Sequence, residues 1–339
     1  MNKLNFLAAA TSIALCAVQT AFAEEPTFGD PTVYGRLNLT LERARVEGAD
    51  ADTKFVDNGS RFGARAGTSI GDEASAMIQV EGLLRHDPNR WMVKSRDTWV
   101  GFQDARLGTL RYGMMEGPLY HATYDEISMH NHDSGRSSDK LLAEDATGGR
   151  MSKSVYYRAP IAPPLKAEVL HAFLAKDPAQ PNAANPNHDE FAVTYEAADS
   201  WIAGGYAESR NLKVDKAWTL AASTTVKGIV LAGLYERSAA IPAAGATAYR
   251  NYARIAAKYP LGKHEYHINY AVAGSLSTTS ESGATQATLG YNYNLTEQTK
   301  VYAIATRIGN KRNASYSFLD DTPNGAANRS IALGFRQEF

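Results

Sequence analysis

Hydrophobic and polar side chains alternate with a period of two along most of this chain. In residues 286–295 the odd positions are apolar or aromatic, whereas the even positions are polar or glycine. The same alternation recurs in residues 33–42, 78–85, 190–196, 253–259 and 265–270. Because successive side chains of a β-strand point to opposite faces, this pattern predicts strands with one apolar and one polar face.

Sixteen such strands are expected, and their connections alternate between short and long. The predicted strands cover residues 31–46, 60–70, 73–87, 91–104, 106–116, 150–160, 164–176, 189–198, 200–211, 215–226, 228–238, 249–260, 263–275, 283–295, 298–309 and 328–339. Short turns are expected at 199–200, 227–228, 261–262 and 296–297. Long loops rich in Gly, Pro, Asn and Ala are expected at 46–59, 176–189, 239–248, 276–282 and 310–327.

The length of these strands favours a membrane barrel over a soluble β-sandwich. Sandwich strands usually have about 5–6 residues, whereas many of these have ten or more, which suffices for a tilted membrane crossing. Closing the sheet removes its edges and satisfies every backbone group in lipid. The predicted fold class is therefore all-β: a sixteen-stranded antiparallel transmembrane β-barrel with short periplasmic turns and long extracellular loops.

The N-terminus predicts export. An apolar stretch over residues 4–18 is followed by Ala21 and Ala23, which form an A-x-A cleavage site of a secretory signal peptide. This stretch is short for a membrane span. We therefore expect residues 1–23 to be a cleaved signal peptide and residues 24–339 to form an outer-membrane barrel.

Charge and cysteine content restrict the possible partners. The net charge of −1 gives no general attraction for a polyanion, so no nucleic-acid partner is expected. The single cysteine, Cys16, lies in the predicted signal peptide, so the mature chain has no disulfide and no Cys-ligated metal. The sequence predicts no cofactor.

One connection is far longer than ordinary loops. About 35 residues separate the strand that ends near Gly113 from the one that starts near Arg150. A barrel of sixteen strands encloses an aqueous lumen unless something narrows it. A long third loop folded inward would form the constriction, and its candidate residues are Tyr120, Tyr124, Asp125, Glu126 and Asp133.

Arginines lie on the polar faces of the strands that precede this loop. They are Arg36, Arg61, Arg65, Arg96 and Arg111. A basic wall facing Asp125 and Glu126 across a narrow pore would give a transverse field that orients polar solutes and screens ions. Alternatively, these arginines are solvated lumen residues without a special role.

Several segments, in this order and spacing, carry a family resemblance. They are PTVYGRLNL (31–39), SRFGARAG (60–67), AMIQVEG (76–82), SRDTWVGFQDARLGTLRYG (95–113), RMSKSVYYRAP (150–160) and SIALGFRQEF (330–339). Over essentially its whole length the chain resembles the general diffusion porins of Gram-negative bacteria, especially the neisserial and Bordetella/Burkholderia-like branch. The resemblance implies a homotrimer in outer-membrane lipid, passive diffusion of ions and small hydrophilic solutes, and no enzymatic activity. It also implies an arginine ladder at Arg36, Arg61 and Arg96 opposite an acidic third loop.

The chain also departs from the family pattern. Met114 stands where the ladder would have another rung, and the Pro-Glu-Phe-Gly-Gly type of third-loop segment is missing. The terminal Phe339, with Phe335 and Leu333 on its face, resembles the assembly signal read by the barrel-insertion machinery. Gln337 occupies a position where an apolar residue is common.

Other functions have weaker support. His130, His132 and Asp133 have the composition of a metal site, although a solvated loop tip explains them as well, and no metal is predicted. A barrel-embedded hydrolase would have Ser, His and Asp available, but there is no G-x-S-x-G segment. An adhesin or purely structural barrel is the main alternative, and it would need neither an inward loop nor an arginine wall.

Overall fold

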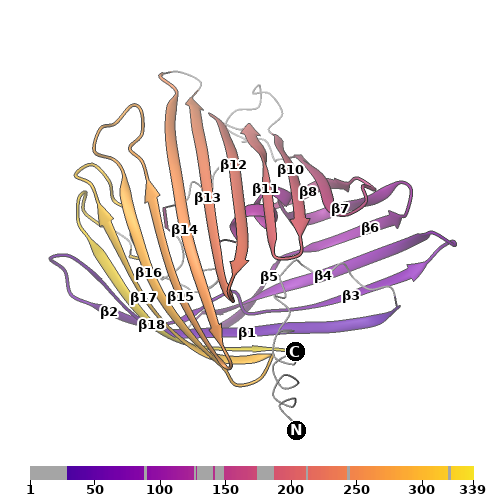
Figure 1. Ribbon diagram of the computed structural model, residues 1–339, viewed down its shortest axis with the longest axis horizontal. Helices are drawn as coiled ribbons and strands as arrows, with labels where there is room; N and C mark the ends of the chain where they lie inside the picture. The colour runs from indigo at the N-terminus through magenta and orange to yellow at the C-terminus, as the bar shows by residue number, and fades with distance from the viewer. Residues whose placement is uncertain are drawn as a thin grey trace, which may run out of the picture.

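The computed structural model describes residues 29–87, 90–125, 127, 140–141, 149–173, 187–210, 213–242, 245–319 and 322–339. Eighteen strands in this part of the chain form one sheet that is rolled into a barrel (Figure 1). They are β1 (Gly29–Val46), β2 (Asp52–Asp57), β3 (Arg61–Ser69), β4 (Ala74–Asp87), β5 (Arg90–Ser95), β6 (Thr98–Asp104), β7 (Gly108–Glu116), β8 (Arg150–Arg158), β9 (Leu165–Phe173), β10 (Asn187–Ala197), β11 (Ser200–Arg210), β12 (Lys213–Val226), β13 (Ile229–Pro242), β14 (Ala248–Leu261), β15 (His264–Ala273), β16 (Ala284–Asn294), β17 (Thr299–Asn310) and β18 (Asn328–Glu338). A short helix α1 (Pro118–Tyr120) and a π-helical turn η1 (His121–Asp125) follow β7.

The first and last strands close the barrel. β1 pairs with β18 in antiparallel register, with Leu41 opposite Leu333. β2 and β3 pair with successive parts of β1, and β5 and β6 pair with successive parts of β4. Each of these two pairs of strands therefore counts as one interrupted barrel strand, and eighteen minus two gives sixteen. The predicted sixteen-stranded antiparallel barrel is confirmed.

The prediction of a long loop over residues 46–59 is wrong. Residues 52–57 form β2, which pairs with β1 from Leu39 to Ala44, so only residues 47–51 connect the two strands. Between β2 and β3, side-chain hydrogen bonds replace the regular backbone hydrogen bonds to β1. The sequence pattern is interrupted there, so it does not show that β2 and β3 form one barrel strand. The Asn38 N–H donates to Ser60 Oγ at 3.0 Å, and Asn38 Nδ2 donates to the Asn58 carbonyl at 3.1 Å.

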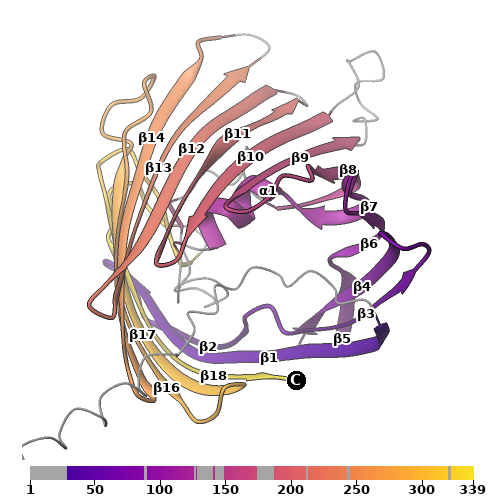
Figure 2. The same ribbon diagram turned by 45° about the vertical axis from the view of Figure 1, so that its right-hand side comes forward.

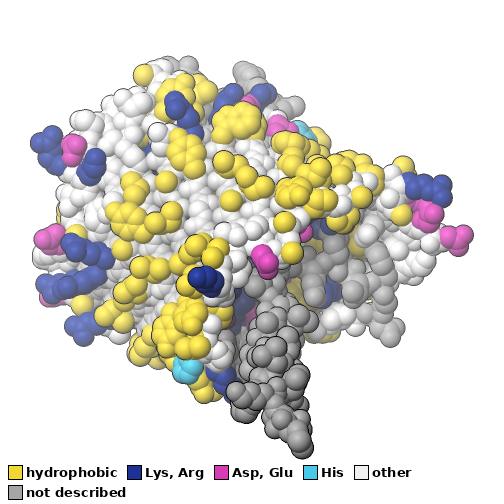
Figure 3. All heavy atoms as spheres, viewed as in Figure 1, with side chains coloured by type: hydrophobic (Ala, Val, Ile, Leu, Met, Phe, Trp, Pro, Cys, Tyr) yellow, Lys and Arg dark blue, Asp and Glu magenta, His cyan; other side chains and the backbone are white. Residues whose placement is uncertain are grey.

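Apolar and polar residues are separated between the outer and inner faces of the barrel. Leu289 is 60% exposed on the outer face, whereas the inward Gln286 of the same strand is 2% exposed. Figure 3 shows apolar side chains spread over much of the visible outer face. On β17 the outward side chain is Val301, while Tyr302 and Ile304 point inward and are buried. The alternation read from the sequence therefore describes a lipid face and a lumen face.

Tight turns connect the strands at the end of the barrel where the C-terminus lies (Figure 1). Lys227 and Gly228 join β12 to β13, and both have positive φ, at 52° and 79°. This conformation matches the twist of a two-residue hairpin. No helix in the described part of the chain is long and apolar enough to cross a membrane.

Candidate functional site

Three of the predicted arginines come together on the inner wall. Arg36 of β1 lies directly opposite Arg61 of β3 in the strand register. Arg61 Nε lies 3.7 Å from Glu81 Oε2 on β4, and Arg96 Nε contacts the other oxygen of the same carboxylate. Arg36 Nε lies 3.1 Å from Glu338 Oε1 on β18. The result is a continuous arginine row, Glu338–Arg36–Arg61–Glu81–Arg96, in which each arginine is paired with a carboxylate.

Glu81 is shared by two arginines of this row, and the sequence analysis gave it no role. Its side chain is only 6% exposed, and its Oε2 also accepts the Tyr34 hydroxyl at 3.1 Å. The Arg96 N–H donates to the Glu81 carbonyl at 2.9 Å, which fixes the backbone before β6. A carboxylate shared by two guanidinium groups orients both of them and removes part of their charge.

The other two predicted arginines are held by aromatic rings. Arg65 lies over the ring of Tyr34, with 5.6 Å between Cζ and the ring centroid. Arg111 Cζ lies 4.3 Å from the centroid of Trp99 and 5.2 Å from that of Tyr156. Both arginines point inward, and cation–π contacts of this kind fix the direction of the charged group.

A further arginine, missed as a functional residue, closes the base of the long loop. Arg150 begins β8 and faces Glu116 at the end of β7. Its Nη2 lies 2.7 Å from Glu116 Oε2, and its Nε lies 2.8 Å from Asp97 Oδ1. The chain therefore leaves and rejoins the wall at one ion-paired point. The sequence did contain a signal for this role, because a charged residue, Arg150, directly follows the long loop.

The described parts of the long loop contact the inner wall at three strands. The Leu119 N–H donates to Glu190 Oε2 on β10 at 3.1 Å, and the Tyr124 hydroxyl donates to Glu236 on β13. The Lys140 N–H donates to Gln286 Oε1 on β16 at 3.0 Å. Figure 2 shows α1 inside the ring of strands. The wall thus supplies side-chain acceptors to donors of the loop.

Apolar packing accompanies these hydrogen bonds. Leu119, Ile127 and Leu141 are at most 1% exposed and belong to one buried cluster with the inner wall. Much of the wall in this cluster is alanine, namely Ala192, Ala203, Ala207, Ala221, Ala232, Ala256, Ala271, Ala273 and Ala284. Small side chains on the lumen face leave the space that the loop fills. We call these nine residues the alanine wall.

Only some of the predicted loop residues can be placed. Tyr120 stacks on Tyr124, with 5.7 Å between the ring centroids. The side chain of Asp125 and the whole of Glu126 and Asp133 lie outside the described residues. The same holds for Ala21 and Ala23 of the predicted cleavage site and for the histidines considered as metal ligands, His130 and His132. In the part of the chain that is described, no group of three His, Cys, Asp or Glu residues could hold a metal.

The C-terminal residue pairs with the first strand. The Gly35 N–H donates to the Phe339 carbonyl at 2.9 Å, and the Phe339 N–H donates to the Gly35 carbonyl at 3.1 Å. A Cβ atom at Gly35 would lie 2.3 Å from the Phe339 ring, so this glycine makes room for the ring. Leu333 and Phe335 point outward and are 61% and 40% exposed.

A closed barrel with an apolar outer face, a polar lumen and a loop packed inside it defines an outer-membrane channel. Comparison with known families agrees, because the model of the Gram-negative porin family matches residues 7–313. The chain therefore belongs to the Gram-negative porin family. A search of curated protein sequences found no match.

Solved porin structures share the fold. The anion-selective porin from Comamonas acidovorans is 19% identical, with 91% of this chain and 99% of that chain covered and a TM-score of 0.76. The trimer form of OmpT from Vibrio cholerae is 15% identical, with coverage of 92% and 100% and a TM-score of 0.66. OmpF from Salmonella typhi is 13% identical, with coverage of 91% and 97% and a TM-score of 0.67.

The family defines the function. The protein is an outer-membrane channel for the passive diffusion of solutes. Its family and fold are those of a non-enzymatic channel.

Proposed function

We propose that the third loop, residues 117–148, narrows this channel, and that the arginine row gives the constriction its electric field. The observation that carries the proposal is where the loop is attached. Counted around the sixteen barrel strands, β1, β3 and β4 are the first three, whereas β10 to β13 are the eighth to eleventh. Glu190 and Glu236 therefore hold the loop on the wall that faces the arginine row across the lumen.

The charges in the row determine the expected field. The row contains three guanidinium groups and two carboxylates, so one positive charge is in excess. On the loop side, Asp125, Glu126 and Asp133 are the proposed acids, with Tyr120 and Tyr124 beside them. Arg65 and Arg111 extend the basic side. Small hydrophilic solutes and ions would cross between these two sides, where a transverse field acts on their charge and orients their dipoles.

Planar-bilayer recordings test this assignment. In a salt gradient, Arg61→Glu is expected to shift the reversal potential towards cations and Asp125→Asn towards anions. A charge in a narrow, partly dehydrated pore should change ion preference by about 1 kcal/mol. Arg43→Gln is the matched control, because Arg43 lies on the same strand as Arg36 but points to the outside.

Two results would contradict the assignment. If both lumen substitutions leave the reversal potential unchanged, the constriction lies elsewhere. A protein that inserts but gives no conductance steps would instead support the structural or adhesin barrel.

We further propose that the exported chain begins at Glu24 and assembles as a homotrimer. The trimer form of the OmpT neighbour supports the oligomeric state, and mass spectrometry of the purified protein would locate cleavage after Ala23. Phe339, with Phe335 and Leu333, would present the signal to the insertion machinery. Deleting Phe339 is expected to reduce trimers in the outer membrane, whereas Leu295→Ala, at an exposed apolar residue in the turn after β16, should not. An unchanged trimer yield after the deletion would argue against the signal.

A further inference from the structure

Two arginines of the inner wall are held against aromatic rings. Arg65 of β3 lies over the ring of Tyr34, and Arg111 of β7 lies over the rings of Trp99 and Tyr156. A guanidinium group is planar, and rings that pack on one of its faces fix the direction of that plane. We call Arg65 and Arg111 the ring-backed pair.

The guanidinium group of Arg111 lies between its rings and the lumen. Trp99 and Tyr156 are only 5% and 6% exposed, whereas Arg111 is half-buried. Gly101 of β6 lies opposite Arg111, and a Cβ atom at this glycine would lie 3.1 Å from Arg111 Cγ and 3.3 Å from Trp99 Cζ3. Because Gly101 has no side chain, Arg111 can reach across to Trp99. One face of its guanidinium plane is then covered by a ring, and the other is turned towards the pore.

The ring-backed pair lies beside the arginine row, on the side of the short turns. The Tyr34 hydroxyl donates to Glu81 Oε2, so the ring that holds Arg65 also contacts the row. In the strand register Arg65 lies opposite Gln79, and Gln79 lies opposite Trp99. Two strand spacings, about 10 Å, therefore separate the backbones of Arg65 and Trp99. The long arginine side chains narrow this gap, so one small solute that has passed the row can contact both guanidinium groups.

We propose that the ring-backed pair binds aromatic carboxylates as they cross the channel. The ring of the solute would stack on the lumen face of the Arg111 guanidinium group, and its carboxylate would pair with Arg65. A saturated ring with the same charge is not flat and cannot stack in this way. The inference rests on the proposed constriction, because a solute must be kept close to this wall to meet both groups.

Block of the chloride current by added carboxylates tests the proposal. Benzoate and cyclohexanecarboxylate, which match in charge and size but differ in planarity, are applied at neutral pH to the purified full-length protein in a planar bilayer. Benzoate is expected to reach half-block at a concentration about two- to fivefold lower. Arg111→Lys keeps the positive charge but has no plane, so its two half-block concentrations should be equal. Its reversal potential in a salt gradient should match that of the unmodified protein, which shows that fold and charge are kept.

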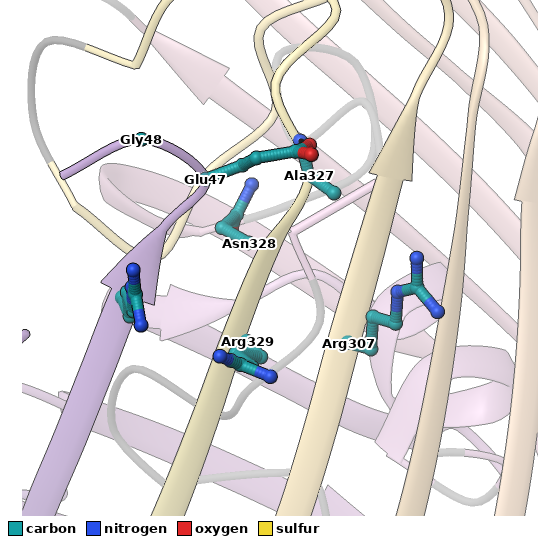
Figure 4. A pocket seen from close by; sticks show the side chains of 7 residues that line it. Glu47, Gly48, Arg307, Ala327, Asn328 and Arg329 are labelled. Carbon is teal, nitrogen blue, oxygen red and sulfur yellow. Dashed lines mark hydrogen bonds between the residues drawn. The ribbon is translucent and has the colours of Figure 1, made fainter.

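Two other arginines provide matched controls. Arg158 lies on the inner wall, and its Nη2 donates to Thr109 Oγ1 at 3.3 Å. Arg329 is exposed on the outer face, where it lines a pocket of about 320 Å³ together with Arg307 (Figure 4). A solute in the pore does not reach that pocket. Arg158→Lys and Arg329→Lys should therefore both keep the preference for benzoate.

Several results would overturn the proposal. Equal block of the unmodified protein by the two acids is one. Another is a benzoate preference that persists both in Arg111→Lys and in Gly101→Ala, which keeps every charge but displaces the stack. Loss of the preference in Arg158→Lys as well would assign it to the basic wall in general. The reversal potentials of Arg61→Glu and Asp125→Asn test the constriction itself, so its failure is distinguishable from equal block by the two acids.

Discussion

The two sides of the inner wall differ in what their side chains do. On β1, β3 and β4 the inward residues Arg36, Arg61 and Glu81 are long and charged, and the arginine row places guanidinium groups beside the lumen. On β10 to β16 the inward residues of the alanine wall are short, and the described parts of the third loop pack on them. The short side chains of the alanine wall leave room for the loop, whereas the long side chains of the arginine row do not.

The loop and its wall also depend on each other chemically. Glu236 is fully buried and Glu190 is 4% exposed, and both accept hydrogen bonds from the loop. His188 Nε2 lies 2.8 Å from the second oxygen of Glu190, and Thr219 donates to Glu236 at 3.4 Å. A buried acceptor that loses its donor costs about 1–3 kcal/mol. The hydrogen bonds of Glu190 and Glu236 beside the alanine wall are therefore complete only when the loop is in place.

Removing the loop from the alanine wall should have the largest effect on the channel. Replacing residues 121–147 with a short Gly-Ser linker is expected to give the largest rise in single-channel conductance, because the cross-section of the lumen is no longer filled. Deleting residues 278–281, which are exposed in the loop between β15 and β16, is the control and should leave conductance unchanged. If both deletions act alike, the third loop does not narrow the pore.

A single substitution can disturb the alanine wall more gently. Ala221 is 1% exposed on β12, and Ala221→Phe adds a ring where the loop packs. Overpacking of this kind typically costs about 1–3 kcal/mol. We expect a lower free energy of unfolding and more frequent conductance fluctuations, measured by denaturant titration in vesicles and by bilayer recording. Ala253→Phe, which points outward from β14, should have neither effect, and equal behaviour of the two variants would contradict the packing argument.

The sequence predicts the barrel well because most strands carry their own period-two signal. It places Arg36, Arg61 and Arg96 on the lumen face for the same reason. It did not reveal Glu81 as their partner, because the contact between residues 61 and 81 depends on the register of β3 against β4. Local alternation says which face a residue has, but not its level in the barrel.

The alanine wall shows a second limit of the pattern. Alternation was read as apolar residues outside and polar residues inside, and an inward alanine such as Ala203 or Ala207 does not follow that rule. Small residues on the lumen face were the available signal for a loop seated there. β2 was missed because Asn58 and Ser60 interrupt the strand, and their side-chain hydrogen bonds become evident only against β1.

The smallest expected effect comes from the charged side. Glu81→Gln removes one negative charge from the arginine row and keeps an acceptor for the Tyr34 hydroxyl. The excess in the row then rises from one positive charge to two, so the reversal potential should shift towards anions. Arg61→Glu changes the charge by two in the other direction, so the shift for Glu81→Gln should be opposite and about half as large, below about 1 kcal/mol.

The control for this pair is Glu73→Gln. Glu73 Oε2 lies 2.7 Å from Arg106 Nε at the short-turn end of the barrel, and both side chains are exposed to solvent. Screening there makes the loss of one charge unimportant for ions in the pore. A shift towards cations for Glu81→Gln would mean that Glu81 mainly positions Arg61 and Arg96 for conduction, because their disordering would then outweigh the gain in charge. No shift at all would place the arginine row away from the narrowest part of the channel.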